Sequence, residues 1–154
     1  MHDFMSLYNI CIATLMVVWT AMAPVQATTN RLTIHMSGFK NDKGMAMVAV
    51  HNTPKTFLKK TAPFRSARVA ITQLKSVAEF DDIPPGKYVV AVFHDENDNQ
   101  DLDGNLMRIP TEHYGFSNNA WRKFGPAKYK DAEFELADTP MMMDITLRTA
   151  FEKN

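Results

Sequence analysis

Cysteine is almost absent from this chain of 154 residues, and the single one, Cys11, lies in the nearly continuous apolar run of residues 7–23. Small side chains follow at Val25–Ala27, where a signal peptidase cuts. These features predict a secretory signal peptide over residues 1–27, cleaved before Thr28. The run has no Lys or Arg before it, so a retained membrane anchor is the alternative, although the run is short and lacks a charged flank.

Loss of Cys11 with the signal peptide leaves the mature chain, residues 28–154, without any disulfide. A periplasmic or secreted chain of this kind depends on its hydrophobic core or on a metal for stability. Its length suffices for one domain that buries about two-thirds of the unfolded surface. No linker, repeat or low-complexity tract interrupts it, so we expect a single domain over residues 28–154.

Excess charge of either sign is also lacking, because 17 Lys and Arg residues balance 17 Asp and Glu residues. The pair Lys59–Lys60, with Arg65 and Arg68, is too sparse for a nucleic-acid footprint. After cleavage, no apolar run is left for stable membrane insertion. A protein, a peptide or a small molecule is therefore the expected class of partner.

Catalytic motifs are lacking as well. None of the serines of the mature chain lies in a G-x-S-x-G elbow, and no glycine-rich phosphate loop is present. The carboxylates that lie close together crowd one loop, whereas an acid–base pair needs two differing environments. A non-enzymatic protein is the favoured interpretation.

Alternation of apolar and polar residues dominates what is present, and it predicts β-strands. Seven segments are predicted as strands: residues 31–39, 45–52, 68–74, 76–80, 87–95, 132–136 and 143–149. Of these, residues 45–52 are apolar on both faces, as in a central strand, and residues 87–95 are rich in β-branched and aromatic residues. The seven segments predict an all-β, Ig-like antiparallel sandwich of about seven strands.

The connections between these strands carry signals of their own. "NDKG" at residues 41–44 predicts a hairpin turn, and Pro84–Gly86 predicts a tight turn into the strongest strand. One short helix is expected over residues 53–60, with Thr53 as its N-cap and Pro54 at its first position. A long loop region follows the strongest strand.

The most unusual segment is "HDENDNQDLDGN", residues 94–105, which places acid or amide side chains at alternate positions. Calcium takes six to eight such oxygen ligands. The glycine and flanking helices of an EF-hand are missing, so a looser calcium loop is predicted. The predicted ligands are Asp95, Asn97, Asn99, Asp101 and Asp103, with Glu112 as a lesser candidate. The alternative is a solvated loop held by Asx-turns, which the mutual repulsion of its carboxylates disfavours.

Histidines offer a second metal interpretation, because imidazole suits zinc or copper. His94 and His51 end predicted strands, and His113 follows the acidic loop, so these rings could converge with His35. Their spacing matches no local ligand pattern, and ordinary core or surface histidines are the favoured reading.

Aromatic residues crowd the segment "HYGFSNNAWRKFGPAKYKDAEF", residues 113–134. These aromatic residues could line a ligand pocket together with neighbouring amides. The favoured interpretation is that they close one end of the sandwich. The candidate ligand-binding residues are His94, His113, Tyr114, Phe116, Asn118, Asn119 and Trp121.

The ordered motifs "PPGKY", "HDENDNQDLD" and "YGFSNN" resemble the bacterial "domain of unknown function 2141" family, over about residues 32–147. The resemblance implies export and a transthyretin-like or carboxypeptidase-regulatory-like β-sandwich, and it carries no known activity. Family members usually have glycine where this chain has Asp98.

These observations together predict an exported binding or structural module with a structural calcium loop. A metal-dependent enzyme that uses His94, His113 and the acidic loop is the first alternative. A carrier of a small apolar ligand is the second.

Overall fold

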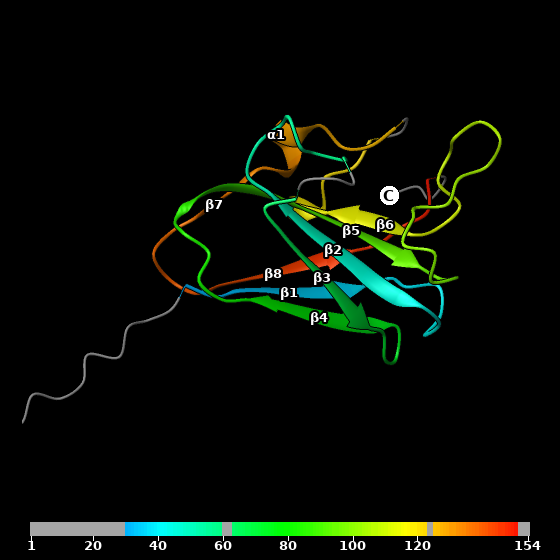
Figure 1. Ribbon diagram of the computed structural model, residues 1–154, viewed down its shortest axis with the longest axis horizontal. Coiled ribbons are helices and arrows are strands. Elements are labelled where there is room, and N and C mark those ends of the chain that lie inside the picture. The colour runs from blue at the N-terminus through cyan, green and yellow to red at the C-terminus, as the bar shows by residue number, and fades with distance from the viewer. Residues whose placement is uncertain (1–29, 60–62, 123–124, 151–154) are drawn as a thin grey trace, which may run out of the picture.

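Two β-sheets packed face to face form the protein (Figure 1). The computed structural model describes residues 30–59, 63–122 and 125–150, so the predicted signal peptide lies outside the described residues. The first sheet has the order β4 (Lys75–Phe80), β1 (Leu32–Ser37), β8 (Met141–Thr146). The second has the order β3 (Arg65–Ala70), β2 (Met45–His51), β5 (Gly86–Asp95), β6 (Tyr114–Phe116), and β7 (Phe134–Leu136) also pairs with β5.

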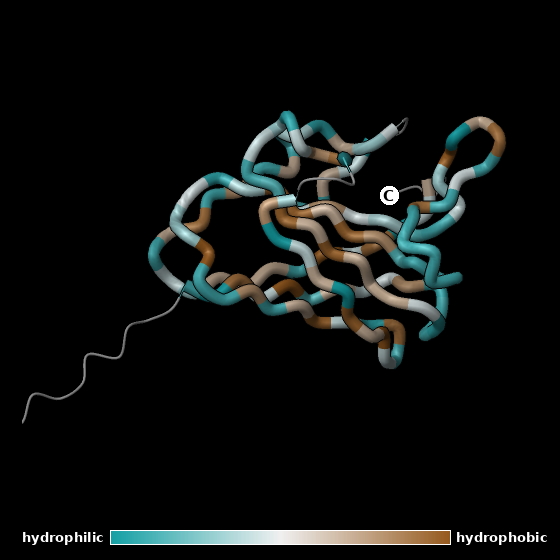
Figure 2. Tube along the Cα trace, viewed as in Figure 1, coloured by the Kyte–Doolittle hydropathy of each residue, from teal (hydrophilic) through white to brown (hydrophobic). Residues whose placement is uncertain are grey.

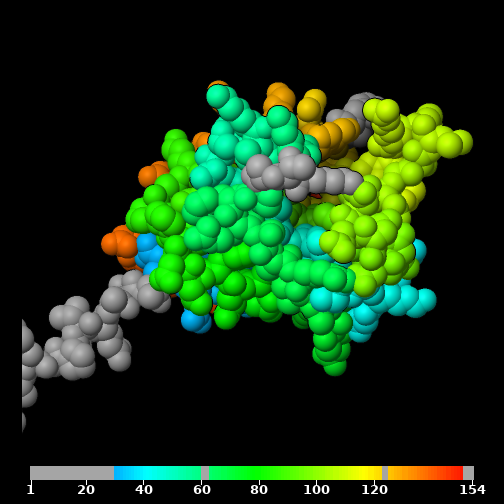
Figure 3. Space-filling model, in the orientation of Figure 1, coloured from blue at the N-terminus to red at the C-terminus, as the bar shows by residue number. Residues whose placement is uncertain are grey.

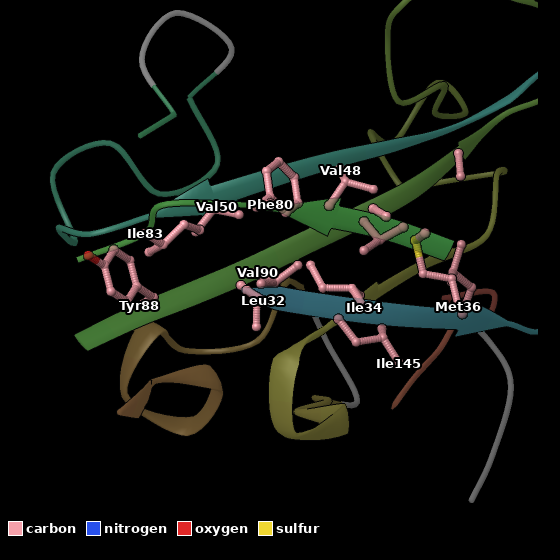
Figure 4. Close-up of a cluster of buried hydrophobic side chains, with 14 of the residues drawn as sticks. Leu32, Ile34, Met36, Val48, Val50, Phe80, Ile83, Tyr88, Val90 and Ile145 are labelled. Atoms are coloured by element: carbon pink, nitrogen blue, oxygen red, sulfur yellow. The ribbon is translucent and has the colours of Figure 1, made fainter. Parts of the chain in front are cut away.

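The core lies between the two sheets, where alternate residues of each strand turn inward (Figure 4). Leu32, Ile34 and Met36 of β1 are at most 1% exposed, and they face Val48 and Val90 of the second sheet. Burying a side chain of this size contributes about 1.5–3 kcal/mol. The apolar residues seen along the strands in Figure 2 thus supply the stability that the predicted mature chain, without cysteine, must find in its core.

The predicted all-β sandwich is confirmed, with two changes in its strands. A further strand, β6, falls in the aromatic segment, and β3 begins at Arg65 and not at Arg68. The sheets are not wholly antiparallel, because β8 returns to pair with β1 in parallel. A parallel pair needs a crossover connection, and here the rest of the chain between β1 and β8 supplies it.

Two of the predicted connections are wrong. Residues 41–44 form no hairpin, because β1 and β2 belong to different sheets and the turn carries the chain across the sandwich. The helix predicted near Thr53 is a series of turns over residues 52–58. Leu58 has a φ of +60°, which a right-handed helix cannot accommodate. The short helix is instead α1 (Tyr129–Ala132), after a 3-10 turn, η1 (Ser117–Asn119).

No helix among the described residues is long and apolar enough to cross a membrane.

The segment of particular interest is the long connection between β5 and β6. It leaves the second sheet at one end and projects beyond the body of the molecule (Figure 1).

Candidate functional site

The acidic loop begins at Asp95, the last residue of β5, whose side chain is fully buried. Its carboxylate accepts hydrogen bonds from the backbone N–H groups of Asn99 at 3.0 Å and Gln100 at 2.9 Å. A buried carboxylate is costly unless such bonds satisfy it. Asp95 therefore fixes the first turn of the loop, in which Asp98 and Gln100 take left-handed φ values of +65° and +64°.

Glu112 closes the far end of the loop and is 6% exposed. Its Oε1 accepts the backbone N–H of Glu96 at 2.9 Å, and its Oε2 accepts that of Asp103 at 3.0 Å. One carboxylate thus ties the start of the loop to its middle. Each bonded oxygen keeps a second lone pair, so these contacts are compatible with a cation ligand.

The side chains of Asn97, Asn99 and Asp103 gather on the partly exposed side of the loop. The Asp103 carboxylate accepts the Nδ2–H groups of Asn97 at 2.7 Å and of Asn99 at 3.0 Å. The Asn97 Oδ1 accepts the backbone N–H of Asn99, and the Asn99 Oδ1 accepts that of Asp101 at 2.7 Å. These last contacts are the Asx-turns that the solvated alternative predicts.

Five of the six predicted calcium ligands therefore separate into two groups. Asn97, Asn99 and Asp103 lie within hydrogen-bond distance of one another, whereas the carboxylates of Asp95 and Glu112 face backbone N–H groups. Over the described residues, no group of three or more His, Cys, Asp or Glu side chains is placed to hold a metal ion. A metal site built from oxygen ligands in this loop would need amide and backbone oxygens beside its carboxylates, as calcium sites commonly have.

Neighbouring turns anchor the acidic loop to the sandwich. Lys40 Nζ and Asn41 Nδ2 donate to the Glu96 carboxylate at 2.9 and 2.7 Å. The hydrogen bond from Lys40, and then that from Asn41, lowers the pKa of Glu96 below its ordinary value of 4.5. On the other side, Arg68 of β3 forms an ion pair with Asp98. Asp98 stands where family members usually have glycine, and its side chain thus adds a contact to the second sheet. Its φ is left-handed, a conformation that glycine adopts with less strain.

The histidines do not gather in one place. His94 and His51 lie toward opposite ends of the β2–β5 pair, since His94 is opposite Ala46 whereas His51 is opposite Val89. The register of the two strands therefore contradicts a convergence of these two rings. His35 lies in the other sheet, on β1.

His94 and His113 are neighbours, because the His94 N–H donates to the His113 carbonyl at 2.8 Å. Their rings contact backbone carbonyls, with His94 Nε2 2.8 Å from Lys43 O and His113 Nδ1 2.7 Å from Gly38 O. The His94 ring also packs edge-on against Phe39. These contacts hold the connection between β1 and β2, which contains Gly38 and Lys43, against the start and end of the acidic loop.

The aromatic residues pack mainly against one another. Phe116 is 4% exposed and lies 5.7 Å from the Phe57 ring, which in turn meets Tyr129 at 5.5 Å. This cluster covers the outer side of β5, and not the open end of the sandwich that the favoured interpretation predicted. A small recess beside it is lined in part by Tyr114 and Trp121.

The amides of the aromatic segment bind the backbone. Asn118 Nδ2 donates to the Glu133 carbonyl at 2.9 Å. Asn119 Oδ1 accepts the Thr146 N–H at 2.8 Å, and its Nδ2 donates to the Asp144 carbonyl, so this side chain caps the free edge of β8. The amides of Asn118 and Asn119 thus hold neighbouring backbone to the sandwich.

Sequence reasoning missed the tip of the β5–β6 connection, where Leu106 and Met107 are 105% and 75% exposed. The signal was available, because two large apolar residues follow directly on a stretch of acids and amides. Only the folded chain shows that they stand away from the core.

The two sheets and the long anchored loop define this chain as an all-β sandwich protein. The family model described as "Uncharacterized protein conserved in bacteria (DUF2141)" matches residues 34–144, and the chain belongs to this family. No curated protein and no solved structure matches it.

Proposed function

We propose that the protein is an exported, non-enzymatic binding module whose acidic loop takes up one structural calcium ion. The observation that carries the proposal is the meeting of Asn97, Asn99 and Asp103 side chains at 2.7–3.0 Å. These distances join amide nitrogens to the Asp103 carboxylate, so the three side chains surround one place in the loop. Carboxylate and amide oxygens are the ligands that calcium prefers, and turning the amides would bring their oxygens to that place. Asp101 lies between Asn99 and Asp103 in the sequence and is half-buried. It is the fourth expected ligand.

The rearrangement that calcium would require is small. In the structure, the amide N–H groups of Asn97 and Asn99 donate hydrogen bonds to the Asp103 carboxylate. A cation in the same place would replace these hydrogen bonds, with the amide oxygens turned toward it. The backbone around them is already fixed by the buried carboxylates of Asp95 and Glu112, so little ordering entropy opposes binding.

Calcium would have a structural effect in this position. The loop lies between the turn that holds Lys40 and the strand that holds Arg68, and it leads into β6. Fixing its outer side would fix the surface that the loop presents to a partner. The absence of a paired acid and base in the sequence favours such a binding role over catalysis.

The experiment is thermal unfolding of residues 28–154, which contain the eight strands that the structure describes, in EDTA and then in calcium. With a Kd near 10⁻⁴ M, about 1 mM calcium adds about 1.4 kcal/mol to the free energy of unfolding and raises Tm by about 4–7 °C. Magnesium is the control, since it prefers a stricter octahedral site and its own water. An equal Tm in EDTA and calcium would contradict the proposal.

A further inference from the structure

The β5–β6 connection contains a projection, residues 102–111, which we call the finger (Figure 3). Its base is an isolated β-bridge between Gly104 and Pro110. Its tip is a turn in which the Asn105 N–H donates to the Ile109 carbonyl at 2.9 Å and the Arg108 N–H donates to the Asn105 carbonyl at 2.8 Å. The finger is thus a closed hairpin turn with a defined shape.

The side chain of Asn105 holds the tip further. Its Oδ1 accepts the backbone N–H groups of Met107 at 2.9 Å and Ile109 at 3.1 Å. Satisfying the backbone from inside the turn leaves the side chains of Leu106 and Met107 pointing to solvent. The turn therefore presents these two residues in a fixed arrangement without using either for its own stability.

The tip is the most apolar protruding point of the described surface. Among the large apolar side chains that the structure describes, Leu106 at 105% and Met107 at 75% have the highest exposed fractions. Figure 2 shows hydrophobic residues at the end of this projection, beyond the hydrophilic stretch of the acidic loop. Two adjacent apolar side chains that protrude in this way can enter the apolar phase of a partner or a membrane.

The charge of the finger complements an anionic surface. Between residues 104 and 111 the only charged side chain is that of Arg108, which is exposed beside the apolar pair. The nearest carboxylates are already engaged in hydrogen bonds, because Asp103 accepts the amides of Asn97 and Asn99, and Glu112 accepts backbone N–H groups. An apolar tip with one cation at its rim matches a bilayer, whose acyl region lies below a layer of phosphates.

The small size of the tip argues for a bilayer over a protein partner. A stable protein interface needs about 800 Å² from each partner, far more than two side chains can supply. The acidic loop beside the finger is too polar to extend the apolar patch. Insertion into a fluid lipid surface needs no matching shape, and each apolar side chain that enters it contributes separately.

We propose that the finger docks the protein reversibly on a phospholipid surface, with Leu106 and Met107 entering the acyl boundary and Arg108 meeting the phosphates. The contact is shallow and peripheral, since two side chains cannot anchor a chain permanently. It goes beyond the binding role proposed above, and it does not depend on calcium.

The test measures the partition of residues 28–154 onto vesicles of phosphatidylcholine and of phosphatidylcholine mixed with phosphatidylglycerol. The double variant Leu106→Ser and Met107→Ser should lower partition by about tenfold or more on both compositions. Arg108→Gln should lower it by about fivefold on the anionic vesicles alone. The matched control is Met142→Ser, which removes a 67% exposed methionine from the outer face of β8 and should change nothing.

Depth of insertion gives an independent readout. In Leu106→Trp, the added indole should shift its emission to the blue on vesicles and be quenched by brominated acyl chains. Met142→Trp should show neither effect, and Trp121 is common to both variants. An unquenched Leu106→Trp, or equal partition of the double variant and the unmodified chain, would overturn the proposal. Self-association that the double variant abolishes would overturn it too, because the occupant would then be a second copy.

Discussion

Glu112 accepts the backbone N–H of Asp103 through a carboxylate oxygen at 3.0 Å, nine residues back along the chain. The other oxygen accepts the N–H of Glu96, so a single side chain closes the acidic loop on itself. This arrangement explains how a loop rich in carboxylates can be held in one shape. Backbone dipoles, and not side-chain cations, face the buried charge.

Glu112→Gln should therefore destabilise the loop, because an amide NH₂ group would replace one acceptor opposite a backbone N–H. We expect the free energy of unfolding to fall by about 1–3 kcal/mol. Hydrogen exchange should show faster exchange at the amides of Glu96 and Asp103. Glu79→Gln is the control, since this exposed residue lies 3.7 Å from Arg31 on the surface of the first sheet, where ion pairs contribute little. Equal unfolding curves for both variants would contradict this role of Glu112.

The calcium response should depend on the outer carboxylates of the loop. Asp101→Asn with Asp103→Asn keeps the shape of both side chains but removes both charges, so the Tm rise in 1 mM calcium should disappear. Asp138→Asn, at an exposed turn before β8, should leave the rise unchanged. A rise that persists in the double variant would place any calcium elsewhere. Differential scanning calorimetry of the three proteins provides the comparison.

Gly44 should tolerate no side chain, because its backbone approaches the end of β5. Its φ is +65°, and a Cβ there would overlap the carbonyl oxygen of Asp95. Gly125 has a similar φ of +76°, but a Cβ there would meet nothing within 4 Å. Gly125→Ala should thus cost only the strain of a left-handed alanine, about 1–2 kcal/mol. Gly44→Ala should cost clearly more, as measured by urea unfolding, and equal losses would refute the close approach.

Protonation of His51 should make stability depend on pH. Burial lowers the pKa of His51 in the folded state below the ordinary 6.5, and its ring lies edge-on to Phe57 at 5.8 Å. As pH falls below about 6.5, the unfolded chain takes up a proton at this site before the folded chain does, so the free energy of unfolding decreases. The decrease ends once the folded protein also protonates His51, and above pH 6.5 the effect vanishes.

His51→Gln is the matched variant for this test. Its Tm should change less than that of the unmodified chain between pH 7.5 and pH 5, because the other histidines are common to both proteins. Parallel Tm profiles for the two proteins would mean that His51 contributes nothing to the pH dependence.

Much of the fold could be predicted from the sequence. Alternation of apolar and polar residues predicted β1, and the β-branched and aromatic side chains of residues 87–95 predicted β5. The strand β6 was missed, since its three residues are all buried and so show no alternation. The helix expected at Thr53 failed for a local reason, the left-handed Leu58.

The candidate site was predicted in part. The alternating acids and amides identified the loop, and Asn97, Asn99 and Asp103 do meet. The sequence could not tell that Asp95 and Glu112 would face backbone N–H groups, because that depends on which residues the fold buries. Nor could the sequence show that His51 and His94 lie far apart, because the register of β2 on β5 sets their distance along the sheet.

The sequence by itself determined the strand pattern, the core composition and the concentration of acid and amide side chains after the strongest strand. These are local properties, fixed by the order of neighbouring side chains. Tertiary structure alone decided that the turn at residues 41–44 crosses between sheets, that β8 runs parallel to β1, and that Leu106 stands exposed. Each of these depends on contacts between distant segments, whose free energies are set by burial in the assembled sandwich and not by neighbours in the chain.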